Sequence, residues 1–153
     1  MKKNKAIFLQ ILIVLISIGT LTFMLWEPHL EGRNVNATIF DIYFNDPFLA
    51  CAYIASIAFF MALYQTFKVV GYAGQNNLFS QSTLKSLRII KYCARTLVVF
   101  VLTGEAYLFI VRPEDDIAGG VFMGLLAIVL FGTIAIVATR FEKNLQNKII
   151  SNQ

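Results

Sequence analysis

Charged residues are scarce in this sequence, and their scarcity decides its class. Only 14% of the 153 residues are Asp, Glu, Lys or Arg, whereas 58% are hydrophobic and the mean hydropathy is +0.68. Soluble proteins carry roughly a quarter charged residues, and a small soluble domain needs a polar surface around its core. The composition therefore excludes an ordinary soluble domain and indicates a protein that lies in a lipid bilayer.

Histidine and cysteine are also rare, which limits the chemistry. The chain has one histidine, His29, and two cysteines, Cys51 and Cys93. A nucleophile with a base, or a cluster of metal ligands, cannot be assembled from so few groups. We therefore expect no enzymatic activity, no metal and no cofactor. We also expect two free thiols, because Cys51 and Cys93 fall near opposite ends of their predicted helices, beyond the reach of a disulfide.

Long apolar runs are what the sequence has in abundance. A hydrocarbon core of ~30 Å is crossed by about 20 helical residues, and backbone polar groups in lipid must be paired within their own segment. The runs predict four helical spans, at about residues 6–26, 47–70, 89–111 and 117–139. The first run is too long for a signal peptide and has no cleavage site, so it predicts an uncleaved anchor. We expect a single all-α domain over residues 1–153, an integral membrane four-helix bundle.

The basic residues predict how the spans are threaded. Eleven of them fall on one side of the four spans: Lys2, Lys3, Lys5, Lys68, Lys85, Arg88, Lys91, Arg95, Arg140, Lys143 and Lys148. The other side holds only Arg33 and Arg112, together with most of the acidic residues. Because short loops rich in Lys and Arg stay in the cytoplasm, both termini should be cytoplasmic and the membrane should be the cell membrane. Charges sorted in this way form no basic patch, so we expect no direct nucleic-acid binding.

The two longer loops differ in character. Residues 27–46 form the outer loop, whose second half mixes aromatic, β-branched and acidic residues as in an interfacial layer. Residues 71–88 form the inner loop, in which Ser80 or Ser82 can cap a helix. Leu84, Leu87 and Ile90 then follow at helical spacing. We therefore expect the third helix to begin before its apolar run, as an amphipathic turn.

Several short motifs resemble a known family. They are Phe79-Ser80 before Leu87-Arg88-x-Ile90, then Asp116-Ile117-Ala118-Gly119-Gly120, and finally Phe141-Glu142 followed by Leu145-Gln146-Asn147. In this combination the chain resembles the prokaryotic membrane family called domain of unknown function 2975. The resemblance implies a four-helix membrane protein, often encoded beside a small helix-turn-helix regulator, and it brings no established activity and no catalytic residues.

Glu105 is the sharpest candidate for a functional residue. A charged side chain well inside a span is costly, by about 2.5–3.5 kcal/mol at the centre on insertion scales, so it needs a partner or a proton. Arg112 follows seven residues later on the same helical face, about 10 Å along the axis. One interpretation is structural, with Glu105 protonated or hydrogen-bonded to a hydroxyl such as Tyr53 or Thr22. The others are a role in moving or sensing protons, ions or a ligand, and an oligomer contact.

Gly120 and Gly124 form a G-x-x-x-G motif in the fourth span. Small residues at this spacing let another helix approach closely. The sequence leaves open whether they pack within the bundle or between copies in a homo-oligomer. Ala55 and Ala62 belong to a matching small face on the second span, which makes that span the expected partner of the fourth.

Two classes of function follow from these patterns. The first is a non-enzymatic accessory, sensory or regulatory protein that binds a cytoplasmic protein, such as a helix-turn-helix regulator, through the basic loop and tail. The second is a small transporter or channel-like oligomer in which Glu105 lines a path. The first is favoured, because a transport route usually leaves several intramembrane polar groups and broken helices. Here only Glu105 lies deep in a span.

Overall fold

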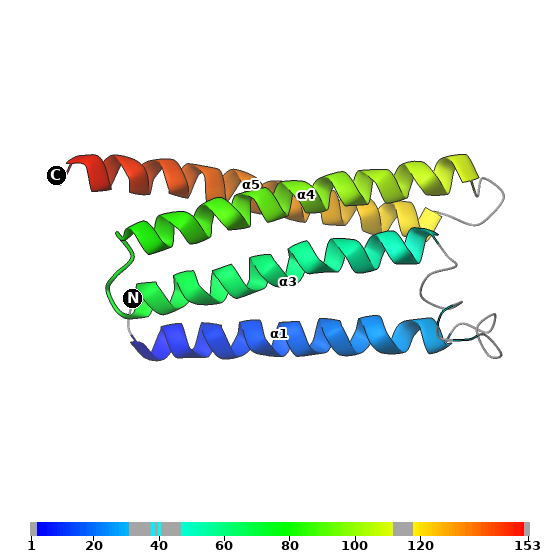
Figure 1. Cartoon of the computed structure of the whole chain (residues 1–153), viewed down its shortest axis with the longest axis horizontal. Coiled ribbons are helices and arrows are strands. Elements are labelled where there is room, and N and C mark those ends of the chain that lie inside the picture. Colours follow the sequence, from blue (N-terminus) through cyan, green and yellow to red (C-terminus); the bar gives the residue numbers. More distant parts are fainter. Residues whose placement is uncertain (1–2, 31–37, 39, 41–46, 112–117, 152–153) are drawn as a thin grey trace.

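The computed structural model of the chain describes residues 3–30, 38, 40, 47–111 and 118–151. These residues form four long α-helices and, among themselves, no strand. The helices are α1 (Lys3–Leu30), α3 (Pro47–Gly74), α4 (Gln81–Val111) and α5 (Ala118–Ser151). They run alternately up and down, so that α1 begins and α5 ends at the same end of the bundle (Figure 1). The prediction of an all-α four-helix bundle is confirmed.

The helices have the length and surface that a bilayer requires. Each is long and apolar enough to cross a membrane. Large apolar side chains point outward from all of them, for example Phe8 at 67% exposure, Ile57 at 67%, Ile110 at 78% and Val129 at 67%. A surface helix of a soluble protein carries polar residues on its outward face. An apolar outward face of this kind is stable in contact with the hydrocarbon chains of lipids.

The helices extend further than the predicted spans and continue into the predicted loops. Residues 27–30, assigned above to the outer loop, continue α1. The inner loop, predicted over residues 71–88, is confined to residues 75–80. The fourth helix continues twelve residues past residue 139, to Ser151. The length of an apolar run shows where a helix leaves the hydrocarbon core of the membrane. The helix itself can continue further when it packs against another helix or has suitable capping residues.

A defined turn joins α3 to α4. Asn76 has a φ of 56°, and the Asn77 N–H donates to the Tyr72 carbonyl at 2.9 Å, which is the bond pattern of a Schellman motif. Ser80 then begins α4, because its Oγ accepts a hydrogen bond from the Thr83 N–H at 3.3 Å. Of the two predicted caps, Ser80 is the one used. The expected early start of the third helix is confirmed, since Leu84 lies in a helical, buried position.

The helices pack in chain order, α1 against α3, α3 against α4, and α4 against α5 (Figure 1). The pair α1 and α3 is tied at both ends by hydrogen bonds. Gln10 Nε2 donates to the Phe67 carbonyl at 3.2 Å, and the Tyr53 hydroxyl donates to the Met24 carbonyl. The expected contact of the second span with the fourth is limited to a few residues, such as the rings of Phe59 and Phe131, because α5 has its extended contact with α4.

The bundle has a basic end, at which α1 begins, α3 ends, α4 begins and α5 ends. It carries Lys3, Lys5, Lys68, Lys85, Arg88, Lys91, Arg140, Lys143 and Lys148. At this end Leu84, Leu87 and Leu145 form a buried apolar cluster, with Val69 and Ile149 packed against it. Within lipid there is no hydrophobic driving force that buries apolar side chains between helices. A buried apolar cluster is expected instead where α4 and α5 project beyond their apolar runs and meet water.

Candidate functional site

Glu105 lies on α4, six residues before its end at Val111. Its Oε2 atom is buried and has no hydrogen-bond partner among the residues that the structure describes. The two hydroxyls considered above do not serve it. Tyr53 donates to the Met24 carbonyl of α1, and Thr22 is exposed on α1. The Oε2 atom is therefore held inside the bundle without a hydrogen bond from either of these two hydroxyls.

The Glu105 carboxyl is accommodated by a glycine on the facing helix. A Cβ atom added to Gly124 of α5 would overlap Oε1 of Glu105. Gly120, one turn earlier on α5, would place a Cβ at an ordinary contact distance of 3.4 Å from Cδ1 of Leu108. Both glycines of the motif thus face α4, and only Gly124 provides space that the neighbouring side chain occupies.

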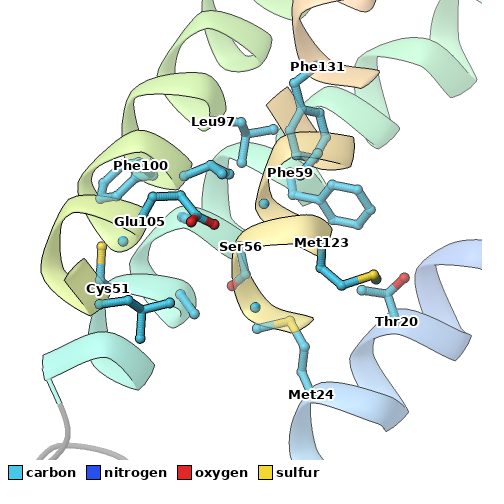
Figure 2. A pocket seen from close by; sticks show the side chains of 18 residues that line it. Thr20, Met24, Cys51, Ser56, Phe59, Leu97, Phe100, Glu105, Met123 and Phe131 are labelled. Atoms are coloured by element: carbon cyan, nitrogen blue, oxygen red, sulfur yellow. The ribbon is translucent and has the colours of Figure 1, made fainter. Parts of the chain in front are cut away.

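Glu105 lines a cavity of about 430 Å³ between the helices. Figure 2 shows its carboxyl directed from α4 into the space beside α5, with Thr20 and Met24 of α1 across from it. All four helices contribute to the wall, and most of the lining side chains are apolar. The lining residues are Thr20, Met24, Cys51, Ala52, Ala55, Ser56, Phe59, Leu97, Phe100, Val101, Gly104, Glu105, Leu108, Gly120, Met123, Gly124, Ala127 and Phe131.

A second polar arrangement, at the basic end, was not foreseen from the sequence. Glu142 of α5 is only 7% exposed and accepts hydrogen bonds from two cations of α4. Arg88 Nε lies 3.1 Å from Oε1, and Lys91 Nζ lies 2.5 Å from Oε2. We call this group the Glu142 clamp. The available signal was the spacing of Arg88 and Lys91, which places both on one face of α4.

The clamp fixes the charge of Glu142. This residue lies beyond the apolar run that ends near residue 139. Burial favours the neutral carboxyl, but hydrogen bonds from Lys91 and Arg88 and the charges of these residues outweigh it and lower the pKa of Glu142. The carboxylate is therefore ionised at neutral pH and links α5 to α4 electrostatically.

Two other candidates fall outside what the structure describes. Arg112 is outside the described residues, and so is the side chain of His29. Within the described residues, no group of three or more His, Cys, Asp or Glu side chains comes together in a way that could hold a metal. Cys51 and Cys93 are both free thiols, and Cys51 lines the cavity while Cys93 does not.

Most of the chain matches a known protein family. The family described as "Protein of unknown function (DUF2975)" matches residues 34–147. This chain belongs to the DUF2975 family. The match confirms the resemblance inferred from the short motifs, and it includes α3, α4 and most of α5, with Glu105, Gly124 and Glu142.

A relative of similar length matches nearly the whole chain. The "Uncharacterized membrane protein YoaS" of Bacillus subtilis (strain 168) is 32% identical over 151 residues, which cover 97% of this chain and 94% of YoaS. No solved structure matches the chain. With four helices of membrane length, these relationships establish a membrane protein of the DUF2975 family, whose activity is unknown.

Proposed function

We propose that this DUF2975 protein is a non-enzymatic membrane anchor that binds a cytoplasmic protein through the projecting ends of α4 and α5. The observation that carries the proposal is the length of these helices. Helix α4 begins eight residues before its predicted apolar run and α5 continues twelve residues after its own. At about 1.5 Å per residue these extensions project by roughly 12 and 18 Å.

The extensions have the properties of a folded module of their own. The apolar cluster of Leu84, Leu87 and Leu145 and the Glu142 clamp both lie between them. A simple lipid anchor needs neither feature. Both features join α4 to α5 at the ends of the apolar runs and beyond them, and a binding surface requires such a fixed separation.

The surface of this module suits an acidic protein. Lys85, Arg140, Lys143 and Lys148 are exposed. Exposed apolar side chains stand among these charges, with Phe79 at 55% and Ile150 at 62% exposure, and Lys148 Nζ lies 4.7 Å from the centre of the Phe79 ring. Apolar residues ringed by charge are typical of protein interaction sites.

The location of the partner follows from the distribution of basic residues. The basic end is proposed to face the cytoplasm of the cell, with both termini inside, because Lys and Arg accumulate in cytoplasmic loops. The helix-turn-helix regulator suggested by the family resemblance is one candidate partner. In this proposal the protein itself does not contact nucleic acid.

Affinity purification with charge reversals tests this proposal. The protein is isolated in mild detergent, and partners are identified by mass spectrometry. A double variant with Lys143→Glu and Lys148→Glu should lose a cytoplasmic protein that the parent retains. The matched control reverses Lys3 and Lys5, which lie on α1 at the same end of the bundle. Equal recovery of every cytoplasmic protein by both variants would contradict the proposal.

A second candidate function is transport by an oligomer, with Glu105 in the path. The observation that favours it is the buried, unpartnered Oε2 atom of Glu105 inside a cavity. Within one copy, the Leu84–Leu87–Leu145 cluster and the Glu142 clamp close the space between α4 and α5 at the basic end. A path between α4 and α5 would therefore need a second copy of the chain, as in a homo-oligomer. Loss of a cation- or proton-dependent flux in liposomes on Glu105→Gln, with folding intact, would establish it over the anchoring function.

A further inference from the structure

We infer that the cavity beside Glu105 is a binding site for a lipophilic amine, a molecule with an apolar body and one N–H-bearing nitrogen. This inference is independent of the proposed anchoring function. It starts from the unpartnered oxygen. Oε2 of Glu105 is buried without a hydrogen bond among the described residues, and buried polar groups are nearly always hydrogen-bonded.

Among the described residues, none donates a hydrogen bond to this oxygen. No Lys, Arg or His is among the residues that line the cavity. Two hydroxyls on α3 donate elsewhere, since Ser56 Oγ donates to the Tyr53 carbonyl at 2.7 Å and Tyr53 donates to the Met24 carbonyl. A molecule that enters the cavity can supply the missing donor.

The composition of the wall selects the kind of molecule. A metal ion needs several oxygen, nitrogen or sulfur ligands, and the described residues offer one carboxyl group here. A buried water needs two to four polar partners, and the mostly apolar wall offers few polar groups besides Glu105. An apolar body with a single donor satisfies both Glu105 and the wall.

Size and wall chemistry agree with an amine that has a ring or chain. A volume of about 430 Å³ is in the usual range for a small-molecule site. Phe59 and Phe131 meet edge to face, with ring centres 6.4 Å apart, and both line the cavity. Aromatic faces attract cations. Met24 and Met123 supply flexible, polarisable side chains that adapt to an apolar ligand.

The packing of the helices provides a route from the membrane. Helix α1 packs closely only against α3, whereas α5 packs against α4. Met24 of α1 and Met123 of α5 both line the cavity, in the space between these two helices (Figure 2). A molecule dissolved in the lipid can therefore enter between α1 and α5 without opening the tightly packed α4–α5 contact.

Binding of a matched pair of probes to the protein in nanodiscs tests the inference. The probes are 4-phenylbenzylamine and its neutral analogue 4-methylbiphenyl, measured by equilibrium dialysis against empty nanodiscs of the same phosphatidylcholine. The parent protein should retain the amine above the empty-nanodisc level and show no such excess for methylbiphenyl. Equal excess of both probes, or no excess of the amine, would overturn the inference.

Variants locate the binding. Glu105→Gln keeps the side-chain volume and should lower the amine affinity by about tenfold or more, because the ionic hydrogen bond is lost. Ala55→Phe leaves Glu105 in place and should reduce binding by filling the cavity. The control Ala106→Leu changes an exposed residue next to Glu105 and should bind as the parent does. Unchanged affinity in a folded Glu105→Gln or Ala55→Phe protein would refute the assigned site.

The lipid composition distinguishes two sources of the same chemistry. Phosphatidylethanolamine carries a primary amine, so nanodiscs that contain it compete with the probe if the natural occupant is a lipid headgroup. Loss of probe binding in those nanodiscs would assign the site to the lipid. Undiminished binding would assign it to a free lipophilic amine.

Discussion

Oε1 of Glu105 on α4 lies over Gly124 on α5, at a place where even a methyl group would overlap it. The relationship makes the acidic residue and the glycine a single structural unit. An acidic side chain can remain inside the bundle because the facing helix has no side chain at that point. Gly120, although in the same motif, makes only an ordinary contact with Leu108.

The first prediction separates the two glycines. Gly124→Ala should displace the Glu105 carboxyl and lower stability by about 1–3 kcal/mol, the usual cost of overpacking. Gly120→Ala should change stability little. The measurement is thermal unfolding in detergent, with Leu126→Ala at an exposed position as the control. The additional change Glu105→Ala should relieve the overlap and restore part of the stability lost on Gly124→Ala. Equal destabilisation by both glycine substitutions, without relief, would show that the overlap is not the cause.

The second prediction concerns the Glu142 clamp. Glu142→Gln should destabilise the protein by about 1–3 kcal/mol, because hydrogen bonds to charged groups are lost and two cations remain. Lys91→Met should cost more than Arg88→Met, since the Lys91 side chain is 13% exposed and that of Arg88 is 51% exposed. A double-mutant cycle between Lys91 and Glu142 measures their coupling. A coupling energy near zero would mean that the clamp does not join the helices.

The third prediction is the pH dependence of the same group. The pKa of Glu142 is lowered in the folded protein, whereas an unfolded Glu titrates near pH ~4.3. The stability that the clamp contributes is therefore fully present above the unfolded pKa and is lost as the pH falls through the folded pKa. The difference in melting temperature between the parent and Glu142→Gln should be constant near neutral pH and shrink below about pH 4. A difference that grows on acidification would contradict the assigned sign.

The fourth prediction is the orientation in the membrane. Reporter fusions after residues 35, 75, 115 and 153 should report outside, inside, outside and inside, because the eleven basic residues named above lie on one side. A cytoplasmic signal from the fusion after residue 35 would reverse the threading. The proposed partner surface would then lie outside the cytoplasm.

The sequence was sufficient for the number of helices and for the start of α4. Uninterrupted apolar runs admit few alternatives in lipid, and Ser80 with Leu84 and Leu87 is a local signal of a helix start. The pairing of α5 with α4 could not be predicted in the same way. Small residues occur on the second span and on the fourth, and lipid gives no directional preference for one apolar face over another.

The candidate site was predicted in part. An acidic residue within an apolar span, as at Glu105, can be recognised from the sequence alone. Its contact with Gly124 cannot, because that contact depends on the register between the antiparallel helices α4 and α5. The Glu142 clamp was missed for a similar reason. Glu142 is more than 50 residues from Arg88 and Lys91 in the sequence, and it stands among basic residues of a tail that has no apolar run.

Helices α4 and α5 are continuous, so a small tilt at one contact between them produces a larger displacement at their far ends. Along α5 the contact at Gly124 and the clamp at Glu142 are 18 residues apart, and along α4 Glu105 and Arg88 are 17 apart. These separations correspond to about 27 and 26 Å of rigid helix. A tilt of about 5° about the Glu105–Gly124 contact would therefore displace the far ends by roughly 2 Å, enough to break a hydrogen bond in the clamp.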